Sequence, residues 1–165
     1  LLENGLQEQE QKRKVFKVEA PIYARQDDSY ITILPYDGFK ISYTLDYQHP
    51  VIGSSYFEFD ADKIDFAEEI AKARTFGFAA EVEKLHEQGL ALGGSLENAV
   101  LIEETKTVNP LRFENEFVRH KILDVIGDMF LNGRIMGHII AVKSGHRLHV
   151  KLAEKIREKM LEEEI

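Results

Sequence analysis

The spacing of apolar residues changes near residue 60, and this change limits the fold more than any other feature of the sequence. From residue 15 to 60 the chain is rich in β-branched and aromatic residues, with turn signals at Asp27-Asp28-Ser29 and Tyr36-Asp37-Gly38, a pattern typical of short strands. The clearest strands are expected at residues 31–34, 39–45 and 56–59. After Asp62 the apolar residues recur with a helical period. Strands followed mostly by helices indicate an α+β fold, in which helices cover one face of a sheet.

Capping residues divide the second part of the chain into elements. Asp62 suits the N-cap of a first helix, while Gly89 and Asn132-Gly133 are stop signals for two later ones. Helices are predicted at residues 64–73, 79–88, 114–131 (or from 116) and 151–163, and strands at residues 99–102 and 139–142.

The composition excludes several classes of protein. The chain has 165 residues, of which 44% are apolar and 30% charged, as in a globular domain with a buried core. Its 21 Lys and Arg against 29 Asp and Glu give a net charge of −8, which disfavours general nucleic-acid binding. The absence of Cys means that a metal site would use His, Asp or Glu. No apolar run approaches the ~20 residues of a transmembrane helix and no signal-peptide core is visible, so a cytoplasmic location is expected.

The first residues indicate that the chain starts inside a longer protein. Leu1-Leu2-Glu3-Asn4-Gly5 has the composition of a last helical turn closed by an Asn-Gly cap, and the start of that helix is absent. Residues 7–14 are polar and of mixed charge, as in a linker. We therefore expect a fragment of a longer chain, with a processed or trimmed terminus as the alternative.

One face of the longest predicted helix carries an imidazole and two carboxylates. His120 and Asp124 lie about 40° apart around the helix and one turn along it, and Asp128 continues the same stripe. Zn²⁺ accepts His nitrogen and Asp oxygen, and this spacing allows two ligands from one helix to reach a single ion. An exposed His–Asp pair, which stabilises a helix by about 0.2–0.5 kcal/mol, has the same spacing. Spacing alone favours this second interpretation.

Two further regions have compositions that suit a binding site. Lys143-Ser144-Gly145-His146 lies between a predicted strand and the last helix, where His146 can serve as ligand, base or acid, or have no role at all. Arg74-Thr75-Phe76-Gly77-Phe78 and Leu90-Ala91-Leu92-Gly93-Gly94-Ser95 surround a short helix, as in a mobile flap, an apolar channel or an ordinary core with turns. The remaining histidines have no such context and are interpreted as ordinary positions: His49, His86, His138 and His149.

Four motifs carry a resemblance to one known family. They are Arg74-Thr75-Phe76-Gly77-Phe78, the glycine-rich segment at residues 89–95, the helix segment at residues 111–128 and Lys143-Ser144-Gly145-His146. In this order they resemble the second half of the UDP-3-O-acyl-N-acetylglucosamine deacetylases, the zinc amidases of lipid A synthesis in Gram-negative bacteria. The resemblance implies the second of two similar domains at residues 15–165, after an inter-domain helix end and linker at residues 1–14. It also implies a small βαβ-like insert for the acyl chain at about 77–103.

The resemblance implies catalytic roles for residues in these motifs. His120 and Asp124 match two of three zinc ligands, and His146 matches the catalytic histidine. Asp128 matches the carboxylate that orients this histidine, and Thr75 matches the threonine that hydrogen-bonds the oxyanion.

Further positions match the substrate-binding residues of the family. Lys121, which we group with the catalytic residues, and Lys143 match lysines near the nucleotide phosphates. Asp46 and Tyr47 fall where the family reads uracil, although the family commonly has Phe in place of Tyr47; a phenol still stacks. The residues that match the passage for the acyl chain are Phe76, Phe78, Val82, Leu85, Ala91 and Gly94.

One feature of the family is absent from this chain. The family's first half supplies the third zinc-binding histidine and the general-base glutamate as adjacent residues, and no Glu-His pair occurs here. The intact protein, expected to be a monomer, would hydrolyse the N-acetyl group of UDP-3-O-(3-hydroxyacyl)-N-acetylglucosamine and release acetate, the committed step of lipid A synthesis. This chain would hold half of that site and be inactive alone. The alternatives are a non-catalytic module that binds a nucleotide-sugar or acyl chain, and part of a fusion with a 3-hydroxyacyl dehydratase.

Overall fold

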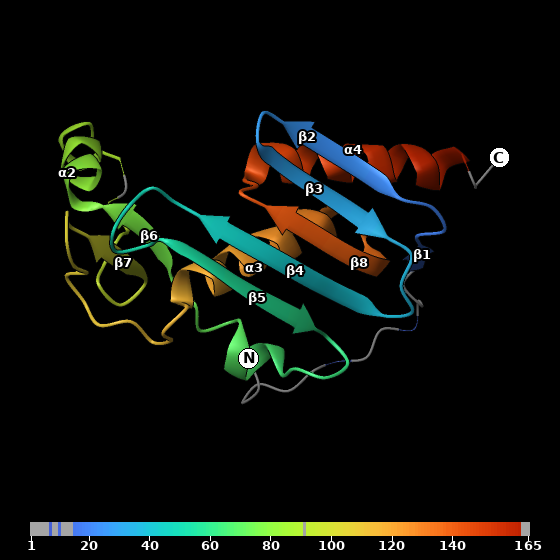
Figure 1. The fold of residues 1–165 in the computed structure, drawn as a ribbon, viewed down its shortest axis with the longest axis horizontal. Coiled ribbons are helices and arrows are strands. Elements are labelled where there is room, and N and C mark those ends of the chain that lie inside the picture. Colours follow the sequence, from blue (N-terminus) through green and yellow to red (C-terminus); the bar gives the residue numbers. More distant parts are fainter. Residues whose placement is uncertain (1–6, 8–9, 11–14, 91, 163–165) are drawn as a thin grey trace.

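The structure is a mixed β-sheet covered on one face by helices, with a smaller βαβ unit beside it (Figure 1). The computed structural model describes residues 7, 10, 15–90 and 92–162, apart from the side chains at 83, 85, 86 and 132. The helix end predicted at residues 1–5 and nearly all of the linker at residues 7–14 lie outside the described residues. Within the described part of the chain, each helix is too short or too polar to cross a membrane.

The sheet is organised around its central strand, β8 (Arg134–Val142). β8 is antiparallel to β3 (Ser29–Leu34) and parallel to β4 (Phe39–Asp46), and its first residues pair in parallel with β1 (Val15–Lys17). The edges are formed by antiparallel pairing of β2 (Ile22–Gln26) with β3 and of β5 (Ser54–Asp60) with β4. The three strands predicted most clearly from the sequence are confirmed as β3, β4 and β5.

β8 has nine residues, where the sequence predicted a strand over residues 139–142 alone. Its odd-numbered residues are buried toward the helices, and its even-numbered residues face the open side of the sheet. The prediction was too short because Gly137 and His138 interrupt the apolar run. A side chain is excluded at Gly137, since a Cβ there would lie 2.8 Å from side-chain atoms of Ile33 on the neighbouring strand.

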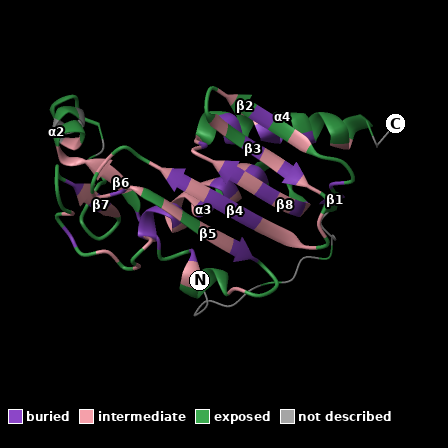
Figure 2. Cartoon of the chain, in the orientation of Figure 1, coloured by how far each residue is buried: buried purple, intermediate pink, exposed green. Residues whose placement is uncertain are grey.

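Two helices, α3 (Glu116–Met129) and α4 (His146–Glu162), lie behind the sheet in Figure 1. Ile122 on α3 and Leu152 on α4 are fully buried in the core that they form with the sheet, and each such side chain contributes about 1.5–3 kcal/mol. Figure 2 shows the alternation of buried and half-buried positions along the central strands that this packing produces. The predicted α+β fold is confirmed.

The last helix begins earlier than the sequence predicted. α4 starts at His146 rather than at residue 151, because the N–H groups of Leu148 and His149 both bond to the Gly145 carbonyl. Only three residues therefore separate the end of β8 from the first turn of α4. The remainder of the predicted helix beyond Glu162 lies outside the described residues.

The helix predicted at residues 64–73 is wrong in its extent. α1 (Phe66–Glu69) has four residues, and its N-cap is Asp65, not Asp62. The Asp65 side chain accepts the Glu68 N–H at 3.0 Å, which satisfies one free donor of the first turn. The helix ends at Ile70, which is fully buried and has a non-helical φ of −120°, and the chain then turns, with the Ala73 N–H donating to the Ile70 carbonyl.

The βαβ unit lies at one end of the sheet, at the left of Figure 1. It consists of β6 (Thr75–Phe78), α2 (Ala79–Glu87) and β7 (Ala99–Ile102), and the two strands pair in parallel. Its topology is the βαβ form that the resemblance implies for the insert. The helix and strand predicted at residues 79–88 and 99–102 are confirmed.

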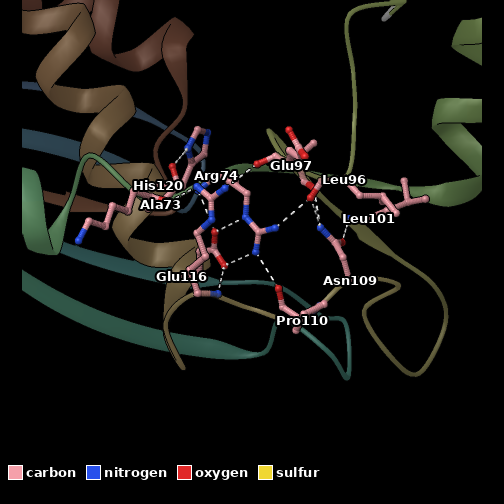
Figure 3. Close-up of polar contacts among 12 residues, drawn as sticks. Ala73, Arg74, Leu96, Glu97, Leu101, Asn109, Pro110, Glu116 and His120 are labelled. Carbon is pink, nitrogen blue, oxygen red and sulfur yellow. Dashed lines mark hydrogen bonds and ion pairs between the residues drawn. The ribbon is translucent and has the colours of Figure 1, made fainter. Parts of the chain in front are cut away.

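A buried ion pair joins this unit to α3 (Figure 3). The fully buried Glu116 accepts the backbone N–H and the Nε–H of Arg74 at 2.9 and 2.8 Å, and the backbone N–H of Arg112 at 2.7 Å. The Arg74 guanidinium also donates to the carbonyls of Leu96 and Pro110. Burial opposes the ionisation of Glu116, but these hydrogen bonds outweigh it and hold the pKa of Glu116 below its ordinary value.

We predict that removing either partner of this pair is far more costly than removing a surface pair. Arg74→Met and Glu116→Leu should each lower the free energy of unfolding by about 3–5 kcal/mol, because each leaves a buried charge unpaired. The double variant should lose less than the sum. Lys72→Met is the control, since it removes the exposed pair with Glu68 and should cost less than about 1 kcal/mol. Urea unfolding measures all four; additive losses would contradict the prediction.

Candidate active site

α3 brings together His120 and Asp124, the two residues expected to bind zinc. His120 Nε2 lies 3.3 Å from Asp124 Oδ1, and both side chains are largely buried. The other ring nitrogen, Nδ1, lies 3.3 Å from the carbonyl oxygen of Ala73, and a carbonyl can only accept, so Nδ1 carries the proton. Burial lowers the pKa of His120 and favours the neutral ring. The Nε2 lone pair therefore faces a carboxylate oxygen, an arrangement that favours a cation between them.

The second oxygen of Asp124 is held by Lys121. The Lys121 Nζ lies 2.7 Å from Asp124 Oδ2, and the lysine side chain is itself mostly buried. This contact fixes the carboxylate rotamer, which leaves Oδ1 facing His120. Lys121 thus orients the carboxylate while its ammonium group reaches the pocket described below.

The first turn of α4 places His146 over α3. His146 Nδ1 lies 2.7 Å from Asp128 Oδ2, and Nε2 lies 3.8 Å from Asp124 Oδ2. The His146 side chain is 67% exposed, so its Nε2 is accessible to a ligand beside the His120–Asp124 pair. The contact between His146 and Asp128 is the one that the resemblance implies.

The structure places a further histidine, His149, against Asp128. The sequence analysis interpreted it as an ordinary position. It is fully buried, and its Nδ1 lies 2.8 Å from the same oxygen of Asp128. Asp128, His146 and His149 offer ligand atoms within 4.8 Å of one another. The i, i+3 spacing of His146 and His149 could have indicated that both rings lie on one face of α4. This was missed because the helix was predicted to start only at residue 151.

A pocket of about 250 Å³ gathers the residues expected to bind the nucleotide. Its lining includes Asp46, Tyr47, Lys121 and Lys143. Lys143 has a φ of 52°, uncommon for a residue other than glycine, and its Nζ lies 2.7 Å from Asp28 and 3.1 Å from Asp46. Hydrogen bonds to these carboxylates raise the pKa of Lys143. The pocket thus places two lysines, each paired with carboxylates, beside the aromatic ring of Tyr47.

A second, mainly apolar pocket of about 470 Å³ lies in the βαβ unit. Thr75, Phe76, Val82 and Gly94, four of the predicted site residues, line it. The Phe76 ring packs edge-on against Tyr47 and His120, with centroids 6.0 and 6.3 Å away. Phe76 therefore connects the apolar pocket to both the nucleotide-side pocket and the His120–Asp124 pair.

Three predicted residues are not placed in this pocket. Phe78 lies on the same strand, but its ring packs on His49 at 5.0 Å, and it is not among the lining residues. The side chain of Leu85 and the whole of Ala91 lie outside the described residues.

Comparisons with known proteins identify the family of this chain. A sequence model of the UDP-3-O-acyl N-acetylglycosamine deacetylases matches residues 1–158. UDP-3-O-acyl-N-acetylglucosamine deacetylases from Myxococcus xanthus and Nitratidesulfovibrio vulgaris are 47% and 48% identical over 92% and 90% of this chain, which covers 49% of each relative. One from Nitratiruptor is 44% identical over 99% of this chain and 56% of the relative. The chain thus spans about half the length of the curated relatives it matches. It belongs to the UDP-3-O-acyl N-acetylglycosamine deacetylase family.

Proposed function

We propose that this chain provides one half of the active site of a zinc-dependent deacetylase that acts on UDP-3-O-acyl-N-acetylglucosamine in lipid A synthesis. Membership of the family and the names of the relatives support the reaction. The observation that carries the proposal is the His120 lone pair facing Asp124, with the exposed His146 ring beside them. The third metal ligand and the general base would come from a part of the protein outside this chain.

The donor set of the His120–Asp124 pair fits zinc. Two ligand atoms at ~2.0–2.1 Å from a tetrahedral zinc ion are about 3.3 Å apart, and Nε2 and Oδ1 are separated by 3.3 Å. When bound, zinc would polarise the amide carbonyl and lower the pKa of a water molecule. The Ala73 carbonyl on Nδ1 and Lys121 on Oδ2 orient the two ligands toward each other.

The residues of this chain would then handle the leaving group and the developing negative charge. As the amide C–N bond breaks, His146 Nε2 would give its proton to the sugar amine while Asp128 holds Nδ1. The Thr75 hydroxyl, exposed at the start of β6, would donate a hydrogen bond to the oxygen of the tetrahedral species. The products are acetate and the free amine of the sugar.

The two pockets match the two ends of the proposed substrate. Lys121 and Lys143 would bind the phosphates, and Tyr47 would stack on the uracil ring, with Asp46 beside it. The acyl chain would occupy the apolar pocket of the βαβ unit. Phe76 lies between the two pockets. The sugar, which carries both the nucleotide and the acyl chain, would lie beside it.

We predict that the isolated chain binds Zn²⁺ weakly, because it offers the pair His120 and Asp124 without the third ligand. Zn²⁺ added at a concentration equal to that of the chain, and thus below the Kd expected of a two-ligand site, should raise the melting temperature by less than about 2 °C. In the full-length enzyme, His120→Ala and Asp124→Ala should each lower zinc content, whereas His138→Ala, on the open face of the sheet, should retain it. Metal analysis and thermal melting measure these effects. A tight one-to-one zinc complex of the chain alone would show that the site is completed locally.

We predict that His146→Ala in the full-length enzyme lowers kcat about 10²–10⁴-fold with zinc content intact, because the leaving amine loses its acid. Asp128→Asn should cost less, and the two losses should not add, since the residues act as one unit. Turnover and metal content are measured on the same preparations. Loss of zinc from His146→Ala would identify His146 as a metal ligand instead.

We predict that Gly94→Phe impairs long-chain substrates more than short-chain ones, because the new ring would fill the apolar pocket. Gly93→Phe is the matched control: this glycine does not line the pocket, and a Cβ there meets nothing within 4 Å. Values of kcat/KM for two acyl lengths measure the effect. Equal losses for both lengths would refute an acyl-chain role for this pocket.

A further inference from the structure

The buried imidazole of His149 has no part in the mechanism above, yet both of its ring nitrogens are engaged. His149 lies in the first turn of α4 and is fully buried. Nδ1 lies 2.8 Å from Asp128 Oδ2, and Nε2 lies 2.9 Å from the Ser144 hydroxyl. A buried polar ring with two partners in fixed positions cannot rotate without losing both hydrogen bonds.

The partners determine which nitrogen of His149 carries the proton. An ionised carboxylate can only accept, so Nδ1–H donates to Asp128, and Nε2 then accepts from the Ser144 hydroxyl. Ser144 is itself buried, and its carbonyl accepts the Tyr43 hydroxyl. Burial lowers the pKa of His149, which favours this neutral, Nδ1-protonated ring.

His149 and His146 share a single oxygen of Asp128. The distances to Oδ2 are 2.8 Å for His149 Nδ1 and 2.7 Å for His146 Nδ1. The His146 side chain is 67% exposed, whereas the His149 side chain is fully buried. The exposed His146 ring cannot fix the Asp128 carboxylate in place, because in the proposed reaction the carboxylate positions His146. The rigid partner of Asp128 is therefore His149.

We propose that His149 is a positioning residue for the deacetylation reaction: its Nδ1–H fixes the rotamer of Asp128, and Asp128 in turn aims His146 at the leaving amine. The chain of contacts runs from Tyr43 in the sheet through Ser144 and His149 to Asp128. The core of the domain thereby sets the direction of an exposed catalytic ring. This inference rests on the proposed function, because it concerns the same reaction.

Two amide substitutions separate the two hydrogen bonds of His149. The side-chain nitrogen of Asn can occupy the position of Nδ1 and keep the bond to Asp128, whereas the side-chain oxygen of Gln can occupy the position of Nε2 and accept from the Ser144 hydroxyl. His149→Leu removes both. Ile156→Val, at a fully buried position further along α4, is the control for loss of packing without a change at Asp128.

In the full-length enzyme, His149→Gln and His149→Leu should lower kcat about 10–100-fold, with KM changed less than threefold and zinc content intact. His149→Asn should recover kcat to within about fivefold of the wild type. Combining His149→Leu with Asp128→Asn should cost little more than Asp128→Asn alone. If Asn and Leu are equally impaired, or if Gln and Leu both turn over like the Ile156→Val control, the proposal is overturned.

A second measurement does not depend on activity. Long-range ¹H–¹⁵N NMR spectra of this chain near pH 7.5 should show His149 as the neutral ring protonated on Nδ1, and Ser144→Ala should perturb its Nε2 signal. A ring protonated on Nε2 would overturn the proposed contact. A wild-type enzyme without deacetylase activity but with this tautomer would refute the proposed function and leave the Asp128–His149 bond established.

Discussion

The arrangement of the site depends on the hydrogen bonds that the buried Glu116 carboxylate accepts from Arg74 and Arg112. A fully buried charge is tolerated only when hydrogen bonds replace its hydration, and Glu116 is surrounded by the Arg74 guanidinium and the backbone N–H groups of Arg74 and Arg112. Among the described side chains, every buried nitrogen and oxygen has a partner. Because Arg74 is held, the Ala73 carbonyl on one side meets His120 and Thr75 on the other side begins β6.

α3 and the first turn of α4 position the groups that we propose carry out the chemistry. α3 carries His120, Asp124 and Asp128 along one stripe, and packing against the sheet orients this stripe. The turn after β8 places His146 beside this stripe, because Lys143 has a left-handed backbone and α4 starts at His146 directly after Gly145. A group mounted on a packed helix is positioned more precisely than one on a loop. The exposed imidazole of His146 is therefore held by Asp128, a side chain on a packed helix.

The errors of the sequence-based prediction have a common physical cause. α1 was predicted too long because local periodicity does not reveal that Ile70 is fully buried in the core with a non-helical φ. β8 was predicted too short because Gly137, excluded from bearing a side chain by Ile33, interrupts an otherwise alternating strand. His149 was interpreted as an ordinary position because it lies outside the motifs that indicate a site, and its contacts with Asp128 and Ser144 exist only in the folded structure. In each case a tertiary contact overrode a local preference.

The sequence by itself determined what depends on spacing and residue chemistry. The change from alternation to a helical period determined the α+β class, and the four-residue interval placed His120 and Asp124 on one helix face. Motif order was sufficient to recognise the family. Only the tertiary structure decided which nitrogen of His120 faces Asp124, which lysine lies against which carboxylate, and that a buried His149 shares Asp128 with His146. These depend on directions and burial between segments distant in sequence, which a one-dimensional pattern does not contain.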